Sequence, residues 1–166
     1  MSLTDFIDRS ISRFAKYYSW FALLMVLFVV INVLGRYFFD IRNDYAVDST
    51  WQLYGMLIMF GCSYSLGKEA HIRTDLFWNN YKDRTKAIID FVSYLLLFFP
   101  SFALITYISF NDTSAAIEMN ERSSETMAQL IIWPMKIGIT LGLVLLMVQA
   151  LSQMIKCYRR IFINEQ

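Results

Sequence analysis

Charged residues are scarce in this chain of 166 amino acids, of which 17% are charged and 57% are hydrophobic. In a typical soluble domain about a quarter of the residues carry a charge. This chain therefore has too few charged residues to form the surface of a water-soluble domain of the same size. The net charge is only +1, and the sequence has neither a glycine-rich phosphate loop nor a run of basic and aromatic residues. The composition therefore predicts a membrane protein and argues against a nucleic-acid partner.

Histidine and cysteine are almost absent, which limits the chemistry open to the chain. A membrane haem protein needs histidine ligands, commonly in pairs, but the single histidine, His71, lies in a polar stretch. The same shortage argues against a metal hydrolase and against a Ser–His–acid triad. Cys62 and Cys157 predict no disulfide framework. We therefore expect no enzyme, no catalytic or metal-binding residue and no cofactor, and we interpret His71 as a residue that orders its loop.

Long apolar stretches make up most of the sequence. They cover approximately residues 18–38, 46–66, 87–110 and 130–154, and each is long enough to cross a hydrocarbon core of about 30 Å. Pro100 lies near the centre of the third stretch, where we expect a bend that neighbouring helices accommodate. We therefore expect an all-α integral membrane protein that forms one domain, residues 1–166, with four transmembrane helices.

The start of the chain, residues 1–17, has a different pattern. Apolar residues recur there at three- and four-residue spacing with charged residues between them, which is typical of an amphipathic helix. The apolar set is Leu3, Phe6, Ile7, Ile11, Phe14 and, at the border of the first span, Tyr18. We interpret this segment as an interfacial helix that lies among the lipid headgroups; a frayed polar start is the alternative.

The distribution of Lys and Arg predicts the orientation in the membrane. Three basic residues precede the first span, five lie within residues 67–86 and three lie within residues 156–160, whereas Arg36, Arg42 and Arg122 lie near the other side. Short loops rich in Lys and Arg stay in the cytoplasm. Both termini and a loop with Glu69, His71, Arg73 and Asp75 are therefore expected inside. The acidic loop at residues 111–129, with Asp112, Glu118, Glu121 and Glu125, is expected outside.

Polar side chains within the spans fall into two layers near that outer side. Arg36, Asp48 and Lys136 share the first layer, and Asn32, Gln52 and Thr140 lie one helical turn deeper. Gly138 and Gly142 match the small-xxx-small pattern of closely packed helices, although they can also be ordinary membrane-helix glycines. No charge lies near the midplane, where a transported solute or ion normally binds. The pattern is more typical of a scaffold than of a carrier.

Several short motifs, taken in order, resemble the small membrane subunit of tripartite ATP-independent periplasmic (TRAP) transporters. They are Asn32-Val33-Leu34-Gly35-Arg36-Tyr37, Trp51, Gly67 followed by His71-Ile72-Arg73-Thr74-Asp75, and Trp133-Pro134-Met135-Lys136. The similarity covers about residues 10–155 with all four spans in order. The sequence departs from the expected pattern at Gln52, where relatives are expected to carry an acid, so a role that needs a charge there does not carry over.

The resemblance implies a subunit of a secondary transporter in a bacterial inner membrane. In that family a large multispan subunit holds the substrate and sodium sites and moves as an elevator, and a periplasmic binding protein delivers an organic acid. The small subunit braces the large one and offers part of the docking surface. The substrates are sialic acid, other sugar acids or C4-dicarboxylates, and no residue of this chain selects among them.

This resemblance gives the polar residues expected roles. The two polar layers and the glycine pair are expected at the interface with the large subunit or in a polar layer beside it, and the acidic outer loop is expected to dock the binding protein. Arg36 is expected to pair with Asp48 or with an acid of the large subunit, unless it and Lys136 extend to the lipid headgroups. The alternative function is an independent four-span channel or carrier that acts as a homo-oligomer.

Overall fold

The structure, a computed structural model, describes residues 3–41, 43–68 and 81–162. Apart from one isolated bridge between Arg122 and Ile131, the regular structure of these residues is helical, which confirms the all-α prediction. The helices are α1 (Leu3–Tyr18), α2 (Trp20–Phe39), α3 (Asp44–Gly67), α5 (Asp83–Ser93), the π-helical turn η1 (Tyr94–Phe98), α6 (Phe99–Glu118) and α7 (Trp133–Phe162). The part of the expected cytoplasmic loop that contains Glu69, His71, Arg73 and Asp75, residues 69–80, lies outside the described residues.

Three continuous helical segments in the described ranges are long and apolar enough to cross a membrane: Thr4–Phe39, Arg84–Glu118 and Trp133–Phe162. They cover the first, third and fourth expected spans, so the chain is an integral membrane protein. The second expected span coincides with α3, which has 24 residues. Its crossing of the membrane stays a prediction.

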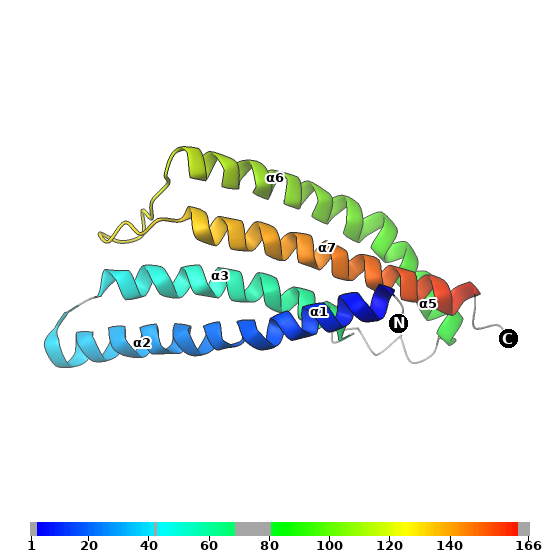
Figure 1. The fold of residues 1–166 in the computed structure, drawn as a ribbon, viewed down its shortest axis with the longest axis horizontal. Helices are drawn as coiled ribbons and strands as arrows, with labels where there is room; N and C mark the ends of the chain where they lie inside the picture. The colour runs from blue at the N-terminus through cyan, green and yellow to red at the C-terminus, as the bar shows by residue number, and fades with distance from the viewer. Residues whose placement is uncertain (1–2, 42, 69–80, 163–166) are drawn as a thin grey trace.

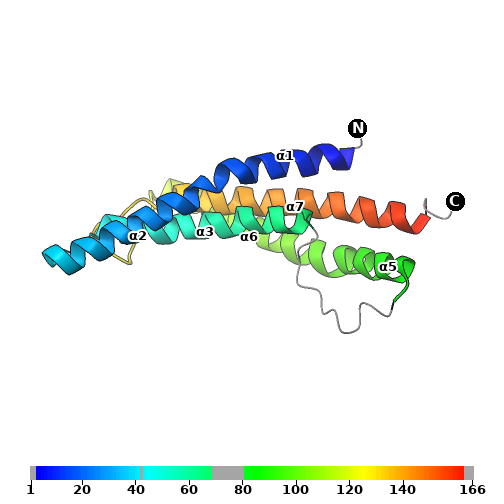
Figure 2. The same cartoon turned by 90° about the horizontal axis from the view of Figure 1, so that it is seen from below.

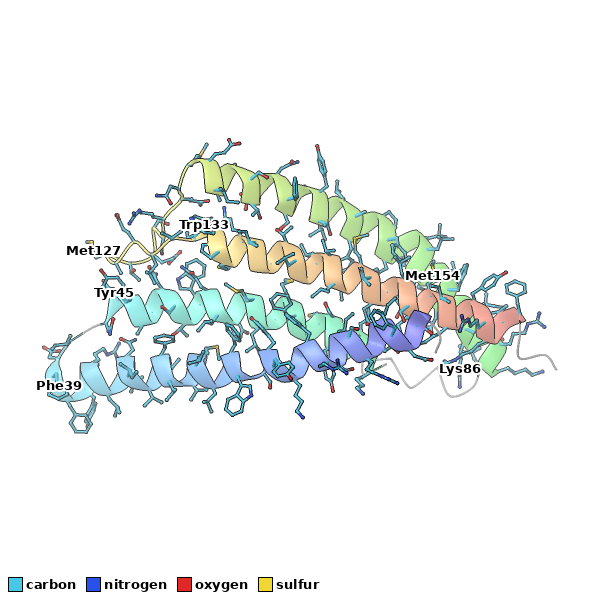
Figure 3. All side chains as sticks on the ribbon, viewed as in Figure 1. Phe39, Tyr45, Lys86, Met127, Trp133 and Met154 are labelled. Carbon is cyan, nitrogen blue, oxygen red and sulfur yellow. The ribbon has the colours of Figure 1, made fainter. Side chains whose placement is uncertain are left out.

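The long helices lie side by side in the order α2, α3, α7 and α6 (Figure 1). Tyr45 and Trp133, near the starts of α3 and α7, lie at the same end of the molecule, so these two helices run parallel (Figure 3). In the perpendicular view α1 and α5 lie on opposite sides of the C-terminal half of α7 (Figure 2). Helix α7 is therefore the centre of the fold, and it contacts α1, α3, α5 and α6.

Helices α3 and α7 approach closely at two glycines. A Cβ atom on Gly138 would lie 2.8 Å from Cγ of Met56, and one on Gly142 would lie 2.7 Å from Cβ of Met59. The Ser63 hydroxyl of α3 donates a hydrogen bond of 3.2 Å to the carbonyl oxygen of Gly142. Small residues let membrane helices pack in this way, and such polar bonds join them. Both glycines therefore face α3 of the same chain.

The expected bend in the third span occurs one turn before its proline. Residues Tyr94–Phe98 form a π-helical turn, and Pro100 is the second residue of α6. Proline cannot donate a backbone hydrogen bond and clashes with the carbonyl of the preceding turn. A wider turn relieves this conflict, and π turns are common where helices bend.

The expected outer loop at residues 111–129 begins later than the sequence indicated. Helix α6 continues through Glu118, so Asp112 and Glu118 lie on a helix. The polar composition of residues 111–118 favoured a loop, but Thr113 and Ala116 are buried. The Thr113 hydroxyl is 2.9 Å from the Thr140 hydroxyl of α7. Tertiary contacts of this kind often outweigh helix propensity. The true connection between α6 and α7, residues 119–132, is hereafter called the connection.

Candidate functional site

Asp48 of α3 lies at the centre of a polar cluster that holds the connection. Its side chain is completely buried. Its Oδ1 atom accepts hydrogen bonds from the Ser123 hydroxyl at 3.0 Å and from Nε1 of Trp51 at 3.1 Å. Its Oδ2 atom accepts one from the Leu130 amide at 3.2 Å. Because Ser123 and Leu130 belong to the connection, one carboxylate fixes both sides of it against α3.

The connection is also closed by bonds of its own backbone. The Ser123 amide donates to the Leu130 carbonyl at 2.7 Å, and the Ile132 amide donates to the Glu121 carbonyl at 3.0 Å. At the far end of the loop, the Met127 amide donates to Oδ2 of Asp44 at 3.3 Å, while the Met127 side chain is 93% exposed. The connection is therefore an ordered platform with an exposed tip, which Figure 3 shows beside the starts of α3 and α7.

Lys136, in the first turns of α7, ties the same platform to α6. Its Nζ atom lies 2.6 Å from Oε2 of Glu121 in the connection and 3.0 Å from Oδ2 of Asp112 on α6. One turn later, the Thr140 hydroxyl is 2.7 Å from the Ser109 hydroxyl. Together with the bonds to Asp48 these contacts form the connection cluster: Asp48, Trp51, Ser109, Asp112, Thr113, Glu121, Ser123, Leu130, Lys136 and Thr140.

A second polar cluster lies near the other end of α7, where α1 contacts it. Oδ1 of Asp8 accepts hydrogen bonds from Nε2 of Gln149 at 2.8 Å and from the Ser152 hydroxyl at 3.1 Å. Oδ2 of Asp8 forms an ion pair with Nζ of Lys156. These four residues are hereafter called the arm cluster, because they join the N-terminal arm, α1, to α7. The carboxylate of Asp8 is thus bonded to three side chains that lie on successive turns of α7.

Two opposing effects act on the Asp8 carboxyl, which precedes the first expected span. Burial alone raises its pKa, because a charge is less stable away from water. The hydrogen bonds from Lys156, Gln149 and Ser152, with the positive charge of Lys156, outweigh this and hold the pKa below its ordinary value of 3.8. Asp8 is therefore ionised at neutral pH, and its contact with Lys156 is a true ion pair.

The spacing of the two clusters matches the thickness of a membrane. Lys136 and Lys156 are twenty residues apart on one continuous helix, which corresponds to about 30 Å at about 1.5 Å per residue. The hydrocarbon core of a bilayer is also about 30 Å thick. No acidic or basic residue lies between these two lysines. The clusters therefore contain the charges at the two ends of a span whose centre is uncharged.

A family model described as "Tripartite ATP-independent periplasmic transporters, DctQ component" matches residues 25–160. The chain belongs to this family. The match confirms the resemblance seen in the sequence, and it makes the chain a component of a TRAP transporter. No curated protein and no solved structure matches the chain. The matched range contains the whole connection cluster and Lys156, while the arm of this DctQ component, with Asp8, precedes it.

The expected pair between Arg36 and Asp48 is not formed in the described part of this DctQ component. Asp48 faces the connection and takes its bonds from Ser123, Trp51 and Leu130, whereas Arg36 is exposed in the last turn of α2. Asp48 therefore needs no basic partner from α2. Arg36 is free to reach an acid of another subunit or the lipid headgroups.

The remaining polar residues expected in the spans lie in different surroundings. Oδ1 of Asn32 accepts a hydrogen bond of 3.3 Å from the Asn43 amide, which joins the end of α2 to the start of α3. Nε2 of Gln52 is buried and has no hydrogen-bond partner among the described residues. Of the acids expected on the outer side, Asp112 and Glu121 pair with Lys136, while Glu118 and Glu125 are exposed.

The sequence interpretation missed the arm cluster. Thr4, Asp8, Ile11 and Tyr18 form one face of α1, and Thr4, Ile11 and Tyr18 are buried. The amphipathic pattern predicted the helix. It also predicted that the apolar residues form the buried face, but one of them, Phe6, is 58% exposed. An acid placed four residues after Thr4 and three before Ile11 was the available signal that the buried face is partly polar.

Proposed function

We propose that this DctQ component is the scaffold subunit of a TRAP transporter in a bacterial inner membrane. It braces a large membrane subunit that moves the substrate, and its connection helps to dock a periplasmic substrate-binding protein. The transported substrate is an organic acid, such as sialic acid, another sugar acid or a C4-dicarboxylate, and its uptake is coupled to sodium. The substrate and sodium sites belong to the large subunit.

The contrast in burial between the helices carries this proposal. Half of the most apolar stretch of α7 is buried within the chain, whereas α2 has no buried residue and the apolar stretch of α5–α6 has none either. Large apolar side chains on the outer helices are widely exposed, among them Val33 on α2 and Leu104 and Phe110 on α6. A flat row of helices with two open apolar edges has room for a large protein partner as well as lipid.

The polar groups support a scaffold rather than an independent carrier. The charged residues of α3 and α7 lie near the helix ends, and the bonds that are found there are made within the chain. A solute or ion pathway needs polar groups near the midplane of the membrane. The seam between α3 and α7 is packed with glycine and methionine, and the hydroxyl of its buried Ser63 is bonded within the chain to the Gly142 carbonyl.

The connection is the part of the chain best suited to meet a soluble protein. The Asp48 bonds hold its backbone, and Met127 at its tip is 93% exposed. Exposed Glu125 on the connection and Glu118 at the adjoining end of α6 outnumber the exposed Arg122, so this surface has a small excess of negative charge. Fixed charges at the rim of an interface guide association with a basic partner. We propose that the binding protein presents basic residues to this surface.

Co-purification with a mild detergent tests the scaffold role. We expect the tagged chain to recover a multispan membrane protein in equal amount when both are produced in the same bacterial membrane. Transport of the organic acid into proteoliposomes is expected only when the large subunit and the binding protein are present. A pure homo-oligomer of this chain that transports solute by itself would contradict the proposal and support the independent channel or carrier.

Cysteine labelling tests the orientation, in a background in which Cys62 and Cys157 are replaced by serine. We expect Met127→Cys to react with a membrane-impermeant thiol reagent in spheroplasts, because the proposed orientation has the connection outside. Lys82 is exposed directly before α5. We expect Lys82→Cys to react only after the membrane has been permeabilised. The reverse result would overturn both the orientation and the docking role.

A further inference from the structure

A groove of about 390 Å³ lies at the bend between α5 and α6, beside the π-helical turn η1. The bend is visible in Figure 1, where α6 curves toward α5. Ser93 precedes the turn, Leu97 lies within it and Ser101 follows it, and all three residues line the groove. All three are exposed, so the groove opens on the surface of the chain. Because π-helical turns are frequent at functional sites, this groove is a candidate contact site.

One wall of the groove is fixed by the core of the chain. Phe98 and Phe102 line the groove, and their rings are stacked with centres 4.2 Å apart. Both rings pack against the buried cluster of Leu66 on α3 and of Leu146 and Ala150 on α7. These contacts are made within the chain, so the wall has its shape without a partner. A preformed surface of this kind binds more tightly, because its side chains need not be ordered on binding.

The same contacts place the groove within the membrane. Leu146 and Ala150 lie between the two lysines at the ends of the α7 span. Phe102 packs against them, and Ser101 directly precedes it. The exposed hydroxyl of Ser101 therefore lies within the hydrocarbon layer, where lipid tails offer no hydrogen-bond partner.

The opposite edge of the helix row has no such feature. From Phe21 to Leu34, α2 contains one polar residue, Asn32, and its side chain is bonded to the Asn43 amide within the chain. The outer surface of α2 at membrane depth is therefore apolar, which suits lipid tails. Polar side chains on the surface of a membrane helix indicate contact with protein, because a second helix offers hydrogen-bonding groups. The two edges thus favour different neighbours.

From this difference we infer that the groove receives one transmembrane helix of the large membrane subunit, and that α2 faces lipid. The inference rests on the proposed scaffold role and adds which edge of the row the partner covers. Ser93 and Ser101 are small enough for the backbone of the incoming helix to approach, and their hydroxyls bond to its polar groups. The ring wall of Phe98 and Phe102 contacts its apolar side chains.

Photo-crosslinking of the complex of both membrane subunits tests the choice of edge. The photoreactive residue p-benzoylphenylalanine is placed at Leu97, which is 70% exposed and lines the groove, or at Val26 of α2, which is 54% exposed. After irradiation in membranes, we expect an adduct with the large subunit from position 97 and none from position 26. A large-subunit adduct from position 26 would overturn the assignment. An adduct of position 97 with a second copy of this chain, or with lipid alone, would overturn it as well.

Substitutions of Ser101 test the contact itself, through the dissociation of the solubilised complex on dilution, followed by native mass spectrometry. Ser101→Trp fills the groove and is expected to weaken the complex about tenfold, because it overpacks the contact. Ser101→Ala removes only the hydroxyl and is expected to weaken it about threefold, the effect of one hydrogen bond between membrane helices. Val26→Trp is the control on α2 and is expected to change nothing. Unchanged dissociation in both Ser101 variants would overturn the inference.

The failure of this inference and the failure of the scaffold role give different results. A chain of unchanged sequence that recovers no multispan partner would remove both. A chain that recovers the partner, with Ser101 variants that bind it equally well, would remove only the groove assignment. Because Ser101 is exposed in the chain, its variants are expected to leave the thermal unfolding of the purified full-length chain unchanged, and this measurement separates a lost contact from a lost fold. If Ser101→Trp fails to fold, Ser101→Ala and the crosslinking decide the question.

Discussion

The two ends of α7 are held in different ways. At the connection cluster, the completely buried Asp48 is bonded by uncharged donors, and two of them lie more than seventy residues away in the sequence. At the arm cluster, Asp8 is partly exposed and is bonded by a lysine as well as by uncharged donors. The first arrangement fixes a platform, whereas the second docks a helix at a place that water and protons reach. The two ends are therefore expected to differ in stability.

Removing the Asp48 carboxylate is expected to have the largest effect. Asp48→Ala leaves the Ser123 hydroxyl, the Leu130 amide and the Trp51 indole without their acceptor. Buried polar groups without a hydrogen-bond partner lower the stability of the folded state. We expect the free energy of unfolding to fall by about 2–4 kcal/mol. Urea unfolding followed by circular dichroism measures it, and limited proteolysis reports on the connection. As a control, Asp112→Ala removes an exposed acid at the same end and is expected to cost less than about 1 kcal/mol. Equal losses would show that Asp48 is not the anchor.

Crowding the seam between the two ends is expected to have the next largest effect. Gly142→Ala places a methyl group 2.7 Å from Cβ of Met59, and overpacking of this kind costs about 1–3 kcal/mol. Gly61→Ala is the matched control on α3, because its methyl group meets open space. It is expected to be neutral or to stabilise by up to about 1 kcal/mol, since alanine favours helices. Thermal unfolding of both variants in detergent measures this. A loss of stability in Gly142→Ala alone would show that the seam requires close packing of the two helices, and not a glycine at every such position.

Removing the ion pair of the arm cluster is expected to lower the free energy of unfolding by less, because that cluster is partly exposed. Asp8→Asn and Lys156→Met each remove the ion pair, and we expect a coupling free energy of about 1 kcal/mol in a double-mutant cycle. Hydrogen–deuterium exchange is expected to rise in α1 and to remain unchanged in the connection. Faster exchange in both regions would mean that the two ends of α7 are not independent.

The smallest effect is expected from pH at the arm. The pKa of Asp8 is lower in the folded chain than its ordinary value of 3.8, so ionised Asp8 stabilises the docked arm at neutral pH. The stabilisation is present above 3.8 and is lost as the pH falls through the lowered pKa. Hydrogen exchange of α1 between pH 6 and about pH 3, corrected for the intrinsic rate, measures this. Asp8→Asn is expected to abolish the pH dependence, and its persistence would assign the effect to another group.

The positions of most helices were predictable from the sequence because a membrane helix satisfies its own backbone hydrogen bonds. Apolar stretches therefore indicate helices without knowledge of the neighbours. The amphipathic start was predictable for the same local reason, and the family followed from short motifs that the family model confirmed. The start of the outer loop was placed too early, because Thr113 and Ala116 owe their burial to contact with α7 rather than to their own composition.

The sequence by itself thus determined the all-α membrane fold, the approximate positions of the helices and the family. The tertiary structure decided which polar groups meet. Asp48 and Arg36 share an expected depth, yet Asp48 bonds to Ser123 and Leu130, because depth along a helix does not specify the direction in which a side chain points. Asp8 likewise finds three partners on α7 only because the arm, which continues the direction of α2, lies against that helix. Hydrogen bonds and ion pairs act over a few ångströms, so they depend on how the helices pack, and the local sequence pattern does not contain that information.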